Sequence, residues 1–300
     1  MPNLYVTTAL GGRVKRITLA GAVSDFATGL GYAHYPVFGP DGNLYVTTGD
    51  VDGGRVKKIT PAGVVSDFAT GLGYTNFSVF GPDGNLYVTT SAVDGGRVKR
   101  ITLAGAVSDF ATGLGNAYFP VFGSDGNLYV TTGSFGSVKR ITPAGVVSDF
   151  ATGLGNAYFS VFGPDGNLYV TTTNNGGGRV KKITPAGVVS DFATGLGYTN
   201  FAVFGSDGNL YVTTSAVDGG RVKRITLAGA VSDFATGLGN AHYPVFGSDG
   251  NLYVTTSITG GSVKKITPAG VVSDFAAGFG IANFSVFGPD TSSNNFFTFF

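Results

Sequence analysis

The chain has only two histidines, His34 and His242, and they occupy the same place in two copies of an internal repeat. A histidine can act as a general base, or it can bind a metal ion when other ligands stand beside it. No acidic residue is near either histidine in the sequence, and the chain contains no cysteine and no glutamate. The sequence therefore predicts no catalytic residue, no metal site and no cofactor.

The other copies of the repeat carry asparagine or tyrosine at the position of the two histidines. If the copies surround a common channel, these seven polar side chains form a hydrogen-bonded ring near its mouth. Such a ring is a candidate binding site for water or a small polar ligand. We call its members the slot residues: His34, Asn76, Tyr118, Tyr158, Asn200, His242 and Asn283.

The elements that must position these residues follow from the repeat. The motif NLYVTT occurs seven times, at spacings of 40 or 42 residues, beginning at Asn3, Asn43, Asn85, Asn127, Asn167, Asn209 and Asn251. Each copy contains four short runs of β-prone residues, separated by turns rich in glycine. Four strands in a period near 42 residues are typical of a propeller blade. We predict an all-β, seven-bladed β-propeller with four antiparallel strands in each blade.

The two ends of the chain indicate how the propeller closes. The chain begins on the second strand of a blade, residues 3–8, and its last repeat ends on a first strand, residues 281–287. Pairing 281–287 with 3–8 would complete the seventh blade and remove two open sheet edges. We predict a single propeller domain over residues 1–290, followed by a hydrophobic tail over 291–300.

The tail is the one segment without a repeat, and it carries Phe296, Phe297, Phe299 and Phe300. Leaving a large apolar side chain in water instead of burying it costs about 1.5–3 kcal/mol. We therefore expect the four phenylalanines to contact another copy of the chain, in a homo-oligomer or filament. A remnant of truncation is the alternative.

Composition excludes several other partners. The chain has 50 glycines, only 12% charged residues and a net charge of +1, without a basic block that would attract nucleic acid. No apolar run approaches the length of a membrane-spanning helix. The sequence opens directly in a repeat motif with no signal peptide, so cytoplasmic location is the default expectation and extracellular location stays open.

All 18 acidic residues are aspartates, and seven of them recur in the motif SDF on the fourth strand of each copy. Lysine and arginine recur on the neighbouring third strand. We expect cross-strand ion pairs on solvated outer strands, each contributing less than about 1 kcal/mol. The pair Asp50 and Asp52 resembles the start of a calcium loop, but no closing acidic ligand follows.

The runs GPDGNLYVTT and RVKKITPAGVVSDF resemble the repeats of NHL-type and streptogramin (virginiamycin B) lyase-like propellers. The resemblance covers the chain to Asp290 and implies a propeller fold. It also implies a histidine base with Mg²⁺ held partly by glutamate, and gluconolactonase-like propellers similarly use acidic and amide ligands, glutamate among them. This chain has no glutamate, so neither ligand set can be transferred to it.

Three functions are consistent with these features. The first is a non-enzymatic structural or recognition scaffold that self-assembles through its tail, and it is favoured by the missing glutamate and the missing nucleophile–base pair. The second is a multivalent carbohydrate-binding lectin with a similar glycan site in each blade. The third is a lyase- or lactonase-like enzyme that uses the two histidines. We predict the first, and hence that the chain is not an enzyme.

Overall fold

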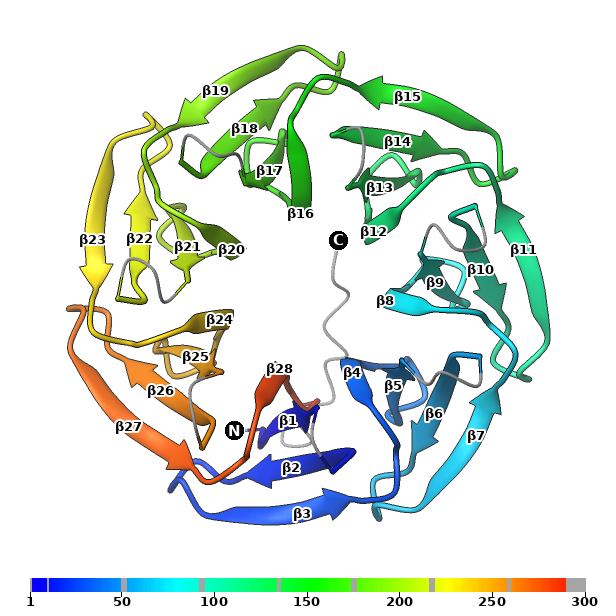
Figure 1. Cartoon of the computed structure of the whole chain (residues 1–300), viewed down its shortest axis with the longest axis horizontal. Coiled ribbons are helices and arrows are strands. Elements are labelled where there is room, and N and C mark those ends of the chain that lie inside the picture. The colour runs from blue at the N-terminus through cyan, green and yellow to red at the C-terminus, as the bar shows by residue number, and fades with distance from the viewer. Residues whose placement is uncertain are drawn as a thin grey trace. The chain divides into compact units, whose positions relative to one another are not determined.

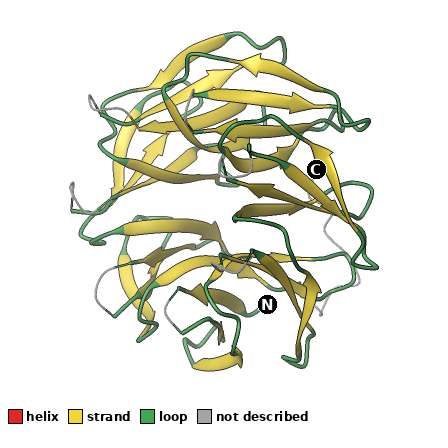
Figure 2. Ribbon diagram, turned by 45° about the vertical axis from the view of Figure 1, so that its right-hand side comes forward, coloured by secondary structure: helices red, strands yellow, loops and turns green. Residues whose placement is uncertain are grey.

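The computed structural model describes residues 2–9, 11–49, 53–91, 95–133, 136–173, 177–215, 219–257 and 260–289. Within these residues all regular structure is β-strand, joined by short turns and loops (Figure 2). None of them belongs to a helix that is long and apolar enough to cross a membrane.

The described strands pair into seven antiparallel sheets of four strands each (Figure 1). The first sheet has the order β28 (Ala282–Phe287), β1 (Leu4–Thr8), β2 (Arg13–Ile17), β3 (Val23–Ala27). The next two sheets are β4 (Ala33–Phe38), β5 (Leu44–Thr48), β6 (Arg55–Ile59), β7 (Val65–Ala69), and β8 (Thr75–Phe80), β9 (Leu86–Thr90), β10 (Val98–Ile101), β11 (Val107–Ala111). The fourth is β12 (Ala117–Phe122), β13 (Leu128–Thr132), β14 (Ser137–Ile141), β15 (Val147–Ala151).

Three further sheets repeat this plan. They are β16 (Asn156–Phe162), β17 (Leu168–Thr173), β18 (Arg179–Ile183), β19 (Val189–Ala193); β20 (Thr199–Phe204), β21 (Leu210–Thr214), β22 (Val222–Ile225), β23 (Val231–Ala235); and β24 (Ala241–Phe246), β25 (Leu252–Thr256), β26 (Ser262–Ile266), β27 (Val272–Ala277). In every sheet the first strand lies at one edge, and three consecutive strands follow it.

The last strand of the chain, β28, pairs with β1, which confirms the predicted joining of the two ends. Beyond the end of β28, the backbone N–H of Gly288 donates a hydrogen bond of 2.9 Å to the carbonyl oxygen of Asn3. The predicted fold class is therefore confirmed: the protein is an all-β, seven-bladed β-propeller.

Contacts between residues divide the chain into two compact units. The first comprises residues 1–130, 139–148 and 283–300, and the second comprises residues 131–138 and 149–282. The sheets that start with β28, β4 and β8 belong to the first unit, apart from Ala282, and those that start with β16, β20 and β24 belong to the second. A single domain over 1–290 stays a prediction, and residues 290–300 lie outside the described part of the chain.

The hairpin after each first strand is built by the residues GPDGN or GSDGN. In the β4–β5 turn, the N–H of Gly42 donates to the carbonyl of Gly39 at 3.0 Å, and Gly42 has a φ of +74°. Glycine adopts this left-handed conformation without steric cost. The Asp41 carboxylate accepts hydrogen bonds from the backbone N–H of Asn43 at 3.2 Å and from the hydroxyl of Tyr45 at 2.8 Å. The turn is thus fixed by its own side chains, as an Asx turn is.

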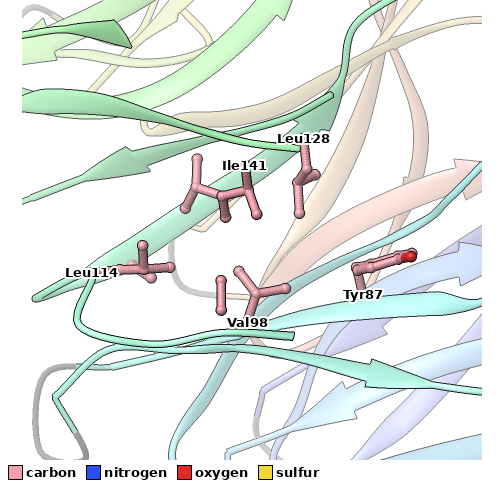
Figure 3. Close-up of a cluster of buried hydrophobic side chains, with 8 residues drawn as sticks. Tyr87, Val98, Leu114, Leu128 and Ile141 are labelled. Carbon is pink, nitrogen blue, oxygen red and sulfur yellow. The ribbon is translucent and has the colours of Figure 1, made fainter. Parts of the chain in front are cut away.

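Hydrophobic clusters fill the space between neighbouring sheets. In one cluster, Tyr87 and Val98 from the β8–β11 sheet meet Leu128 and Ile141 from the next sheet, with Leu114 from the connecting loop (Figure 3). Burial of each such aliphatic side chain stabilises the fold by roughly 1.5–3 kcal/mol. On the third strand, Val98 joins the cluster shared with the next sheet and Ile101 joins the cluster shared with the preceding sheet, so both faces of this sheet are buried. Lys99 and Arg100 between them are only partly buried.

Candidate functional site

Every slot residue is half-buried and lies on the first strand of its sheet. In β8 the pairing register shifts between Thr75 and Ser78, so Asn76 and Phe77 form a bulge in the strand. The same shift occurs in β4, β20 and β24, and β16 has one at Tyr158. A bulge re-aims side chains away from the regular pleat and is frequent beside functional sites. The slot is therefore a backbone feature as well as a position in the repeat.

His34 is held by the neighbouring sheet. Its Nδ1 atom lies 2.8 Å from the backbone carbonyl oxygen of Asn76. A carbonyl oxygen can only accept, so Nδ1 carries the proton in the neutral imidazole, and Nε2 carries the lone pair. The backbone contact thus selects the tautomer in which Nε2 can act as a base.

The asparagines of the slot make the same kind of link. Asn76 Nδ2 donates to the carbonyl of Ala117 at 2.7 Å, and Asn283 Nδ2 donates to the carbonyl of Ala33 at 3.3 Å. In the second unit, Asn200 Nδ2 donates to the carbonyl of Ala241 at 2.8 Å. These bonds run from one sheet to the backbone of the next, rather than from one slot side chain to another. A ligand-binding role for the seven residues stays a prediction.

A row of threonines, which the sequence did not single out, supports the slot from the second strands. Thr47 Oγ1 donates to the carbonyl of Asn76 at 3.2 Å, so this oxygen accepts from both Thr47 and His34. The equivalent bonds are Thr7 to His34 at 2.7 Å, Thr89 to Tyr118 at 2.6 Å, Thr131 to Tyr158 at 3.0 Å, Thr171 to Asn200 at 3.0 Å and Thr213 to His242 at 2.6 Å. The first threonine of each NLYVTT motif is the sequence signal for this contact.

Aromatic rings surround the histidine in the first unit. The His34 ring lies 4.9 Å from that of Phe284 and 5.2 Å from that of Phe77, measured between centroids. Tyr35 contacts Phe77 at 5.3 Å, Phe284 at 5.2 Å and Phe119 at 5.9 Å. Edge-to-face packing of this kind favours a fixed arrangement of the rings. His34 is thus bordered by a mostly apolar aromatic cluster.

The second unit repeats this arrangement around Phe201. Its ring lies 4.9 Å from His242, 5.3 Å from Phe159 and 5.2 Å from Tyr243. An aromatic residue directly after the slot position in all seven copies is the sequence signal that could have revealed both clusters.

The SDF aspartates form the predicted ion pairs with the neighbouring strand. Asp67 accepts from Lys57 at 2.6 Å and lies 3.6 Å from Arg55. The hydrogen bond from Lys57 is the main cause that lowers the pKa of Asp67. The same partners recur as Asp25 with Lys15 at 2.6 Å, Asp109 with Lys99 at 2.6 Å, Asp191 with Lys181 at 2.6 Å, Asp233 with Lys223 at 2.5 Å, and Asp274 with Lys264.

The turn aspartates are also engaged. Lys58 Nζ lies 2.9 Å from Asp41, whose carboxylate already accepts from Asn43 and Tyr45. Burial of Asp41 acts to raise its pKa, but the hydrogen bonds from Lys58, Asn43 and Tyr45 outweigh it and lower the pKa to about 2. Burial and the bond to Asp41 raise the pKa of Tyr45 to about 12. These carboxylates therefore stabilise turns.

The ligand set of the lyase-type metal site is not met by the described residues. Among them, no group of three or more histidines, cysteines or acidic residues is placed to hold a metal ion. The whole chain lacks glutamate. Asp50 and Asp52, weighed above for calcium, lie outside the described residues. We therefore derive no chemical step through a bound cation.

The predicted assembly segment also lies outside the described residues, with Phe296, Phe297, Phe299 and Phe300. A homo-oligomer or filament through these residues stays a prediction. The same holds for a glycan or small polar ligand and for the absence of nucleic acid as a partner.

Comparison with known proteins shows which family the chain is similar to. The model of the virginiamycin B lyase family matches residues 79–279. Virginiamycin B lyase from Staphylococcus aureus is 18% identical, with a TM-score of 0.66 over 84% of this chain and 91% of that one. Its catalytically inactive His-to-Ala variant with quinupristin is 17% identical, with a TM-score of 0.68 over 81% of this chain and 84% of that one.

A gluconolactonase from Xanthomonas campestris is also similar, at 17% identity, with a TM-score of 0.58 over 85% of this chain and 92% of that one. At these identities, the solved structures establish the shared fold alone. No curated protein sequence matches the chain.

These findings correct the functional prediction. The prediction of a non-enzymatic scaffold was wrong, and so was the prediction that the chain is not an enzyme, because the matching family is one of lyases. The expectation of a self-assembling structural protein has no support in them. The missing glutamate bears on one metal site and does not outweigh a family match that spans two thirds of the chain. The chain belongs to the virginiamycin B lyase family.

Proposed function

We propose that the protein is an enzyme that opens cyclic esters, as a lyase with a slot histidine as its base. The match of the lyase family to residues 79–279 is the observation that carries this proposal. The two histidines are the chain's only imidazoles. Imidazole is the side chain whose ordinary titration falls near neutral pH, which suits proton transfer.

The surroundings of His34 favour the role of a base. The backbone carbonyl of Asn76 fixes the proton on Nδ1, at 2.8 Å, and leaves the Nε2 lone pair as the accepting site. The rings of Phe77 and Phe284 border the imidazole and hold its plane. A base held in one tautomer and one orientation loses little entropy when substrate binds.

A lyase cleaves the ester by elimination. The base takes a proton from the carbon adjacent to the alkoxy carbon. The electron pair of that C–H bond becomes a carbon–carbon double bond, while the bond from the alkoxy carbon to the ester oxygen breaks. The oxygen leaves as part of a carboxylate, so the ring opens and no water is consumed. The His-to-Ala variant of virginiamycin B lyase, which is catalytically inactive, supports a requirement for histidine in this type of enzyme.

Hydrolysis is the second candidate, because a gluconolactonase shares the fold. In that reaction the base removes a proton from water, and the resulting hydroxide attacks the ester carbonyl. The two reactions differ in mass balance: elimination in a cyclic ester leaves the mass unchanged, and hydrolysis adds one water.

Liquid chromatography with mass spectrometry tests both reactions. We expect the protein to convert quinupristin into a ring-opened product of unchanged mass, and gluconolactone serves as the substrate for hydrolysis. The matched controls are His34→Asn, His242→Asn and the double variant, because asparagine occupies the slot in three other sheets. If the wild type leaves both substrates intact, or the double variant keeps full activity, the proposal is wrong.

A further inference from the structure

We infer that the reaction takes place at the β4–β7 sheet, where Tyr32 positions the substrate beside His34. This inference rests on the proposed function and deepens it. It assigns the base to one of the two histidines, and it adds Tyr32 as a positioning residue for the substrate.

Two positions on each first strand vary together between the copies. They are the slot position and the position two residues before it. The pairs are Tyr32 and His34, Tyr74 and Asn76, Asn116 and Tyr118, Asn156 and Tyr158, Tyr198 and Asn200, Asn240 and His242, and Ile281 and Asn283. Four copies combine one tyrosine with one asparagine, in either order. The pair Tyr32 and His34 is the only one in the sequence with a ring at both positions.

Tyr32 and His34 lie on the same side of the strand. The N–H of Gly49 donates to the carbonyl of Tyr32 at 3.0 Å, which extends the ladder by one pair beyond Ala33 and Thr48. Side chains alternate along the regularly paired part of a strand, so Tyr32 and Ala33 point to opposite sides. His34 begins the bulge, and its Nδ1 reaches the carbonyl of Asn76 in the next sheet, so it also points to the side opposite Ala33. Ala33, between them, is fully buried in the core cluster shared with the preceding sheet. Tyr32 and His34 therefore point away from that core.

The partner of Tyr32 in the ladder is a glycine, and this decides how the phenol ring lies. Cδ1 of Tyr32 is 3.4 Å from the place that a Cβ at residue 49 would occupy, so the ring packs over Gly49. Tyr32 nonetheless keeps 48% of its surface exposed. Tyr74 occupies the same position on β8 and is 44% exposed. The bond from His34 Nδ1 to Asn76 ties these two strands together.

The first strands of two neighbouring sheets thus each carry an exposed tyrosine, and Tyr32 stands two residues before the proposed base. Aromatic faces bind flat apolar rings through burial and offset or edge-to-face stacking. Tyrosine does so at a low cost in conformational entropy, because it has only two side-chain torsions. A substrate with such a ring next to its ester would be held with the acidic C–H near the imidazole.

The residues near His242 differ from those near His34. The residue two before it is Asn240, whose Nδ2 donates to Ser257 Oγ at 2.5 Å within the same sheet. This position therefore supplies an amide that is engaged with its own sheet, and no ring. The family match spans His242 and not His34, so dependence on His242 alone is the result that would overturn the assignment.

Steady-state kinetics on quinupristin separates the two roles. We expect Tyr32→Asn to raise KM roughly 5–10-fold with little change in kcat, since one lost aromatic contact has about this effect. Tyr32→Phe should keep the wild-type KM because it retains the ring. Tyr198→Asn is the matched control in another sheet and should leave both constants unchanged. His34→Asn should lower kcat by about 100-fold or more, and His242→Asn by much less.

The outcomes distinguish this inference from the proposed function. If His242→Asn alone abolishes turnover, or Tyr198→Asn raises KM as much as Tyr32→Asn, the assignment to β4–β7 is wrong and the lyase activity stands. If the wild type turns over neither quinupristin nor gluconolactone, the proposed function fails. Calorimetry with quinupristin then decides the inference on its own: a Kd that Tyr32→Asn leaves unchanged, or no binding at all, overturns it.

Discussion

The hydroxyl of Tyr45 donates a hydrogen bond of 2.8 Å to the carboxylate of Asp41, four residues earlier in the same hairpin. The contact recurs at Tyr87 with Asp83, Tyr129 with Asp125, Tyr169 with Asp165, Tyr211 with Asp207 and Tyr253 with Asp249. The tyrosine side chain therefore joins the turn to the strand that follows it. The same hydrogen bond stabilises the equivalent hairpin in each of these six sheets.

Acid should weaken the protein through this contact. The pKa of Asp41 is about 2 in the folded chain against 3.8 ordinarily, so its contribution is present above pH 3.8 and is lost as pH falls to about 2. Because Asp41 is exposed and solvent screens its partners, this shift contributes roughly 1 kcal/mol at neutral pH. Urea unfolding across this pH range measures it. Asp41→Asn should lower the free energy of unfolding at pH 7 and flatten its fall at acid pH; an unchanged pH profile would contradict this.

The threonine row should matter for stability. Thr47 is fully buried and donates to the carbonyl of Asn76, while it accepts from the N–H of Tyr35 at 3.1 Å. Thr47→Val keeps the shape but removes the hydroxyl that accepts from the N–H of Tyr35, and it leaves His34 as the remaining donor to the carbonyl of Asn76, which together costs roughly 1–3 kcal/mol. Thr47→Ser keeps the hydroxyl and should cost less. Thermal denaturation compares the two, and equal losses would rule out the hydrogen bond as the cause.

Two glycines with similar backbone angles should respond differently to alanine. Gly96 has a φ of +62°, and a Cβ there would overlap the carbonyl oxygen of Gly115. Gly113 has a φ of +72°, with nothing within 4 Å of a Cβ. We expect Gly96→Ala to cost roughly 2–5 kcal/mol and Gly113→Ala about 1 kcal/mol. Urea midpoints check this, and similar shifts for both would show that φ, not space, sets the cost.

The ion pairs on the outer strands should add little to the free energy of unfolding. Asp109 lies 2.6 Å from both Arg97 and Lys99, but its side chain is 37% exposed. Solvent screens such pairs, so Asp109→Asn should cost less than about 1 kcal/mol, and added salt should reduce the difference further. A loss that is larger and insensitive to salt would mean that these pairs hold the sheets together.

The strands and turns were predictable because their residues act locally. Pro40, Asp41 and Gly42 specify a turn wherever they occur together, and short runs rich in β-branched and aromatic residues between such turns specify strands. The pairing of residues 281–287 with 3–8 followed from counting strands. These are properties of neighbouring residues in the chain, and seven copies repeat them.

The surroundings of the histidine were not predictable from the same information. The contact of His34 with Asn76 depends on a bulge that redirects both residues and on the packing of one sheet against the next. Thr47 looks like any strand threonine until that packing places it under a carbonyl oxygen. The resemblance of the repeats to the lyase family was recognised correctly. Enzymatic activity was wrongly rejected, because no acidic residue lies near the histidines in the sequence and the absence of glutamate was given too much weight.

The pairing of β28 with β1 has a consequence for how the chain is made. On the ribosome, the strands of the six other sheets are made between β1 and its partner β28. The β1–β3 hairpins must therefore wait, with one edge bare, until those strands have been translated. A chain cut short before β28 would have six complete sheets and a free edge on β1, which could pair with a strand of another molecule. Rapid completion of synthesis is thus a safeguard for this protein against aggregation.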